Sequence, residues 1–328
     1  MSTYVYLPST STCTLTSSSV THSTDTFYGV LCSGLTDKTR ISFISSNSSF
    51  SECVRKHIYH SSNLLSNACP ATASDSLCED QSFGSSGHQD PTHSTTFSKC
   101  TFTGCSSTNG GAVYVKGGSV SFLKIMSCTF SQCTATQDNA GAVYVHSISS
   151  FDVTDSSFLQ CTCAGTDMYK HGGGSIFIAH VTCLSVLSSA FINNYCGRDG
   201  AGISLEESNA PTQQVILRCR FIKCVSIGES ADGGGIHIYE NNRNLGLSNC
   251  LFSLCESNNN GGALFHHLKF SETEHSICFC FFHQNKCTSA NDVYLYPSGS
   301  TKTIFHSFSS TTITPRIGPA GNDDNWLP

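Results

Sequence analysis

Residues 100–115 read CTFTGCSSTNGGAVYV, and the return of this pattern along the chain decides the fold. Each copy has Cys or Ser, then Phe two residues later, then Cys or Asn, then a polar stretch that leads to glycine and alternating apolar residues. The phenylalanines of seven copies are Phe102, Phe130, Phe158, Phe191, Phe221, Phe252 and Phe282. Their spacings of 28, 28, 33, 30, 31 and 30 residues indicate stacked structural repeats.

Each repeat predicts short β-strands. Val113 with Val115, and Val143 with Val145, alternate with the period of a strand that buries one face. A second apolar stretch, such as Phe122 to Ile125, precedes the next phenylalanine, so that one repeat supplies two or three strands. We therefore expect an all-β, pectin-lyase-like solenoid, a parallel β-helix of about seven clear coils.

Stacking of the coils places equivalent residues directly above one another. The phenylalanines should then form an internal aromatic stack, and the cysteines a ladder. The Gly-Gly pair suits the sharp corner before a strand, because glycine accepts a positive φ and close approach of backbone.

Two copies keep the sequence Phe-x-x-Asn, at Phe191 to Asn194 and at Phe282 to Asn285. Together with Gly-Gly-Ala, residues 100 to about 295 resemble the polymorphic outer membrane protein (Pmp) repeat of chlamydial autotransporters. They are also similar to the right-handed β-helix families of protists, which have a pectin-lyase-like fold. The resemblance implies a right-handed helix and an adhesin-like protein, extracellular or at the cell surface.

The chain departs from that family pattern at five copies. Cysteine replaces the asparagine at Cys105, Cys133, Cys161, Cys224 and Cys255. Since a thiol packs as a small hydrophobe, we expect burial there in place of the hydrogen bonds of an asparagine ladder.

The 20 cysteines of the chain allow two interpretations. In a secreted protein they would form disulfides, whereas in the repeats they are explained by buried free thiols. No Cys-x-x-Cys pair of the zinc-ribbon type occurs, so we expect no metal at the cysteines.

Composition excludes some partners and leaves the compartment open. Only 12% of the residues are charged and the net charge is −6, which argues against nucleic acid. No apolar run is long enough to span a membrane, and residues 1–8 lack the features of a secretory signal. We expect either a cytosolic protein or one whose export signal is missing from the sequence.

The texture of the sequence divides the chain into three parts. Residues 1–95 are rich in serine and threonine and predict irregular coils or a cap, with one early coil at Ser48, Phe50 and Cys53. Residues 96–313 carry the repeats, and residues 314–328 form a tail.

The segments between Phe-x-x-Cys and Gly-Gly vary in length, so they should be loops along one edge of the solenoid. The longest, residues 162–172, carries Asp167 and Tyr169, and Tyr195 follows in the next copy. We predict these residues as a binding edge for a carbohydrate or a protein surface, because a tyrosine ring can stack on a sugar.

Acidic residues lie on the same edge. Asp138, Asp199 and Asp232 each precede the last glycine of their copy by three residues, and the latter two should stack in adjacent coils. Such a pair could bind calcium or act as the two carboxylates of a retaining glycosidase. The simpler interpretation is turn capping, which Asn109 and Asn260 favour.

Two functions follow from these features. The first is a non-enzymatic scaffold that binds carbohydrate or a protein without a cofactor. The second is a polysaccharide lyase or glycoside hydrolase that uses Asp199 and Asp232, although strings such as Asn-Thr-Asp and Gly-His-Gly are absent. His237 should point outward into solvent, and the neighbours His266 and His267 should face opposite sides of one strand.

Overall fold

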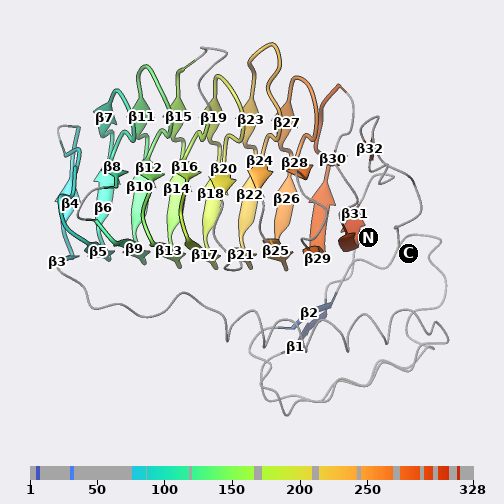
Figure 1. The fold of residues 1–328 in the computed structure, drawn as a ribbon, viewed down its shortest axis with the longest axis horizontal. Helices are drawn as coiled ribbons and strands as arrows, with labels where there is room; N and C mark the ends of the chain where they lie inside the picture. The colour runs from blue at the N-terminus through green and yellow to red at the C-terminus, as the bar shows by residue number, and fades with distance from the viewer. Residues whose placement is uncertain are drawn as a thin grey trace.

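The computed structural model describes twelve segments of the chain, and within them all regular secondary structure is β-strand (Figure 1). The segments are residues 5–7, 30–32, 76–85, 87–117, 120–165, 172–208, 214–241, 245–268, 274–288, 292–297, 302–309 and 316–317. Among these residues no helix has the length and hydropathy needed to cross a membrane.

One coil of the solenoid contains four strands. The first complete coil runs through β8 (Val113–Lys116), β9 (Phe122–Met126), β10 (Thr129–Ser131) and β11 (Thr134–Ala135). The next coil repeats them as β12 (Val143–His146), β13 (Ser150–Thr154), β14 (Ser157–Leu159) and β15 (Thr162–Cys163). Each strand pairs in parallel with its equivalent in the neighbouring coil, which confirms the predicted parallel β-helix.

The strands form three sheets along the solenoid. Sheet I contains β8, β12, β16 (Ile176–Ala179), β20 (Ile203–Ser208), β24 (Ile236–Asn241), β28 (Leu264–Leu268), β30 (Val293–Pro297) and β32 (Arg316–Ile317). Sheet III contains the short strands β7 (Ser106–Ser107), β11, β15, β19 (Tyr195–Cys196), β23 (Val225–Ser226) and β27 (Glu256–Ser257).

Sheet II has two legs that join at β29 (Glu274–His283), with β31 (Lys302–Ser309) paired to that strand. One leg is β3 (Ser76–Glu79), β5 (Thr95–Ser98), β9, β13, β17 (Cys183–Leu187), β21 (Gln214–Leu217) and β25 (Leu245–Ser248). The other leg is β4 (Ser82–Phe83), β6 (Thr101–Thr103), β10, β14, β18 (Ala190–Ile192), β22 (Arg220–Ile222) and β26 (Leu251–Ser253).

Strands also lie outside the region of clear repeats. In-register pairing begins at β3 and β4, before residue 96. A separate parallel pair joins β1 (Val5–Leu7) to β2 (Val30–Cys32). The early coil predicted at Ser48, Phe50 and Cys53 falls outside the described residues.

The core is a continuous stack of phenylalanine rings, as the sequence predicts. From Phe102 to Phe282 the ring centroids of adjacent coils are 4.6 to 5.1 Å apart and the rings are parallel to within 10°. Every ring of this stack is fully buried. Because the spacing equals the distance between paired strands, each ring between Phe102 and Phe282 contacts the rings of both neighbouring coils.

At the corner after each core phenylalanine, cysteine and asparagine both donate a hydrogen bond to the phenylalanine carbonyl of the preceding coil. Asn194 Nδ2 donates to the Phe158 carbonyl at 3.0 Å, and Cys224 Sγ lies 3.4 Å from the equivalent carbonyl of Phe191. Asn194 Oδ1 also accepts the Cys161 N–H at 2.9 Å. The expectation that the thiols only add burial is therefore incomplete, since they also act as weak donors to the preceding coil.

Several corners of each coil use the left-handed backbone conformation, and two of them lie on either side of the strand that carries the core phenylalanine. At one corner it is held by Lys99, Ser127, Asp155, Ser188, Arg218, Asn249 and Phe279, and at the other by Gly104, Gln132, Gln160, Asn193, Lys223, Leu254 and Gln284. The corner before sheet I is the predicted glycine corner. Gly110 has a φ of 52°, and a Cβ on Gly111 would lie 2.2 Å from the Gly141 carbonyl oxygen.

Leu254 is strained at its corner without being buried. Its φ is +57° and its side chain is 38% exposed. Because asparagine adopts this conformation more easily, Leu254→Asn should stabilise the fold by about 1 kcal/mol in denaturant unfolding. Leu254→Ala, which keeps the backbone penalty, is the matched control, and an equal gain from alanine would contradict the explanation.

The free thiols of the cysteine ladders should be inert in the folded protein. Burial raises the pKa of Cys128 to about 11, and the ladder cysteines are buried. At pH 8, without reductant, an alkylating reagent should modify the ladder cysteines only after denaturation. The half-buried Cys287 should react before them. Mass spectrometry of the labelled peptides checks this, and ladder thiols that appear only after reduction would contradict it; Cys183, which is disulfide-bonded, does not belong to the ladders.

Candidate functional site

The turn that leads into sheet I carries a column of small polar residues, which we call the corner column. Its members in successive coils are Asn109, Asn139, Gly172, Asp199, Asp232 and Asn260. Backbone hydrogen bonds hold the column in register, since Gly173 N–H donates to the Asp199 carbonyl and Gly200 N–H to the Asp232 carbonyl. The acids Asp199 and Asp232 thus occupy equivalent places in adjacent coils.

The side chains of the corner column cap the turn of the next coil. Asp199 Oδ1 accepts the Asp232 N–H at 2.8 Å, and Asp232 Oδ1 accepts the Asn260 N–H at 2.9 Å. Asn109 Oδ1 accepts the Asn139 N–H at 3.1 Å in the same way. An amide oxygen and a carboxylate oxygen therefore perform the same capping here.

A second column lies on the outward side of sheet I, five residues after the corner column; we call it the outer column. Its members are Tyr114, Tyr144, Phe177, Ser204, His237, Phe265 and Tyr294. The rings stack at 4.9 and 5.1 Å up to Phe177, stop at Ser204, and resume with His237 on Phe265 at 5.1 Å. The aromatic stack is therefore broken beside the two acids.

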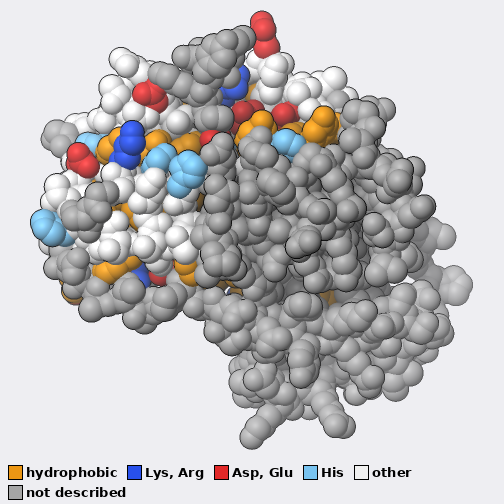
Figure 2. Space-filling view, in the orientation of Figure 1, with side chains coloured by type: hydrophobic (Ala, Val, Ile, Leu, Met, Phe, Trp, Pro, Cys, Tyr) orange, Lys and Arg blue, Asp and Glu red, His pale blue; other side chains and the backbone are white. Residues whose placement is uncertain are grey.

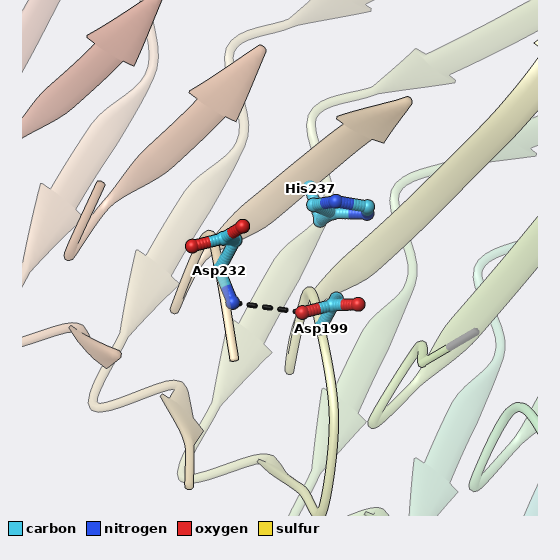
Figure 3. A group of neighbouring side chains, drawn as sticks. All are labelled: Asp199, Asp232 and His237. Atoms are coloured by element: carbon cyan, nitrogen blue, oxygen red, sulfur yellow. Dashed lines mark hydrogen bonds between the residues drawn. The ribbon is translucent and has the colours of Figure 1, made fainter. Parts of the chain in front are cut away.

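Asp199, Asp232 and His237 form one cluster (Figure 3). One potential ligand atom from each lies within 4.8 Å of the others. Asp199 is 6% exposed and His237 is 4% exposed, while Asp232 is half-buried. The guanidinium of Arg198 is 3.9 Å from Asp199 Oδ2, and Ser204 Oγ is 3.5 Å from His237 Nδ1.

The electrostatics of the cluster act most strongly on Asp232. Burial, followed by the nearby carboxylate of Asp199, raises the pKa of Asp232 to about 7. Hydrogen bonds from Asn260 oppose this shift, because they favour the charged form. Near neutral pH the cluster can therefore take up or release a proton at Asp232.

The structure brings together only part of the predicted edge. Asp199 and Asp232 stack in adjacent coils, as expected. Asp138 does not belong to their column, because its N–H donates to the Thr108 carbonyl and its Oδ2 accepts from Asn109 Nδ2 at 3.0 Å. It precedes the corner position of its own coil by one residue.

The predicted tyrosine and loop residues are more dispersed. Tyr195 lies on β19, half-buried, in register with Thr162 and Val225. Asp167 and Tyr169 fall outside the described residues. The binding roles of these residues stay predictions.

Histidine placement differs in one case from expectation. His266 is fully buried on the inward side of β28, next to the half-buried His267, as predicted for opposite faces of a strand. His237 does point away from the core, but the expectation of a solvated side chain is wrong. Its Cβ lies 3.0 Å from where a Cβ on Gly200 would stand, so the preceding turn covers it. The sequence signal for a contact between His237 and the corner column is the spacing of five residues from Asp232.

The surface beside the turns is mixed in character (Figure 2). Hydrophobic, acidic and histidine side chains share a band along the solenoid axis below the turns. Figure 1 places these turns between sheet III and sheet I.

The raised pKa of Asp232 should make stability depend on pH. The folded state retains a proton that the unfolded state loses, so the contribution of Asp232 to the free energy of unfolding falls as pH rises from about 4 to about 7. Asp232→Asn keeps a capping oxygen but does not titrate. The unfolding temperature of this variant minus that of wild type should therefore be larger at pH 8 than at pH 5. The exposed Asp155→Asn is the control, and the same trend in that variant would contradict the assignment.

A comparison with protein families agrees with this geometry. A family model described as a right-handed β-helix region matches residues 84–276, more than half of the chain. No curated protein and no solved structure matches the chain.

Proposed function

Because the chain belongs to the right-handed β-helix family, we propose that it is a non-enzymatic, adhesin-like scaffold that binds carbohydrate on the outward side of sheet I. Proteins with this architecture host many functions, so the proposal depends on the side chains of that face rather than on the fold.

The observation that carries the proposal is a row of partly exposed rings. The centroids of the Tyr239 and His267 rings are 5.0 Å apart with the rings tilted by 51°, and His267 packs edge to face against Tyr296 at 5.0 Å. All three are half-buried, so each ring has one side held by the protein and another available. Rings fixed at a regular spacing offer apolar faces to the sugar rings of a polymer, with polar edges for its hydroxyl groups.

The neighbouring acids support binding rather than turnover. Asp199 and Asp232 each use one oxygen to cap a turn, and Asp199 is nearly inaccessible. A catalytic acid or nucleophile must reach the scissile bond of its substrate. Through these hydrogen bonds the two carboxylates hold the edge on which the rings are displayed.

An array of immobilised neutral and acidic polysaccharides tests the proposal with the purified chain. Wild type should bind at least one polysaccharide, and Tyr239→Ala combined with His267→Ala should weaken that binding about tenfold or more, because the stacking surface is removed. Tyr195→Ala, a half-buried ring on sheet III, is the matched control. Absence of binding in wild type, or loss only in the Tyr195 variant, would reject a carbohydrate site on sheet I.

A second candidate is a polysaccharide lyase or glycoside hydrolase. One observation favours it: the pKa of Asp232 is raised to about 7 next to Asp199, which is the kind of difference that separates an acid from a base. Release of new sugar ends from the same polysaccharides measures turnover. No turnover by wild type would reject the enzyme, whereas turnover lost in Asp199→Asn and Asp232→Asn with the fold retained would favour it.

A further inference from the structure

We propose that Asp199, Asp232 and His237 bind a divalent transition-metal ion of the zinc class between two adjacent coils. The inference goes beyond the carbohydrate proposal and does not depend on it. It differs from the calcium site considered from the sequence, because an imidazole takes part.

Two independent columns change their chemistry at the same two levels of the solenoid. In the described corner column, Asp occurs at Asp199 and Asp232, and all remaining levels carry Asn or Gly. In the described outer column, Ser204 and His237 occupy two levels, and all remaining levels carry Tyr or Phe. Because these columns lie on different elements, a shared change points to one cause located between them.

Turn capping does not explain the charges. Asn109 caps the next coil with the same hydrogen bond that Asp199 makes. Two stacked carboxylates add mutual repulsion and desolvation, both of which disfavour the charged forms. A cation between them would offset both effects, whereas an asparagine pair would avoid them without a ligand.

The charged neighbour of the cluster is Arg198, which lies on the Asp199 side. The Arg198 guanidinium is 3.9 Å from Asp199 Oδ2, which is longer than a charge-assisted hydrogen bond. Burial and the carboxylate of Asp199 raise the pKa of Asp232. A metal ion would lower that pKa by favouring the carboxylate.

The donor set selects the class of ion. Calcium and magnesium prefer oxygen ligands, whereas zinc accepts imidazole nitrogen and carboxylate oxygen together. Zinc bonds of about 2.0 to 2.2 Å require the ligand atoms to approach more closely than the present limit of 4.8 Å. Asp232 is the half-buried member of the three, and water would complete the coordination.

Zinc binding can be measured on the full chain after dialysis against a chelator, in a reductant that does not bind metals. Competition with a chromophoric zinc chelator should give one equivalent bound, and calcium or magnesium in large excess should not displace it. Binding should also raise the temperature of thermal unfolding.

The chain itself supplies substitutions that keep the fold. Asp232→Asn copies the level of Asn260, and His237→Phe copies the level of Phe265, so capping and ring stacking are retained. Each should weaken zinc affinity at least 100-fold, with an unchanged circular dichroism spectrum. His180→Phe is the matched control, because His180 forms a separate histidine pair with His146 at 5.0 Å between ring centroids.

Every other result overturns the proposal. No zinc binding by wild type, or binding unchanged in Asp232→Asn and His237→Phe, removes the site. Loss only in His180→Phe would place the ion at the surface histidine pair. Equal affinity for calcium and zinc, unaffected by His237→Phe, would show a carboxylate site without the imidazole. Sugar binding is read separately, so failure here leaves the carbohydrate proposal unaffected.

Discussion

Parallel, in-register pairing of successive coils is the constraint on which the whole structure depends. It sets the distance between equivalent residues to that between paired strands, as the ring spacings of 4.6 to 5.1 Å in the phenylalanine stack show. Each side chain therefore has its own equivalents as nearest neighbours. Selection at one position acts on a column rather than on a residue, which explains why phenylalanine, cysteine and glycine recur in the sequence.

The same constraint decides what the sequence could reveal. Phe102 and its equivalents, the alternation around Val113 and the Gly110 corner repeat often enough to identify coils without any long-range information. Counting back from Gly141 predicts the wrong column for Asp138, because the strand that follows sets the structural register. The prediction of a solvated His237 is wrong because alternation separates inward from outward residues but does not show that a turn covers the outward side.

The cluster at Asp199, Asp232 and His237 was partly accessible to sequence reasoning. Stacking of the two acids follows from their equal positions in adjacent repeats. The participation of His237 depends on the turn bringing the corner column against the outer column, which is a tertiary contact between different elements. Only when both columns are aligned does the exchange of rings for Ser204 and His237 coincide with the exchange of asparagine for aspartate.

The left-handed corners have a consequence for how such a chain can change in length. A residue inserted into a strand such as β14 would move the left-handed conformation from Gln160 onto a neighbouring side chain and would turn the inward residues outward. Insertion of a whole coil changes neither the corners nor the register. Growth by duplication of about 30 residues is therefore open to this architecture where single insertions in strands are not, and smaller changes are confined to the turns.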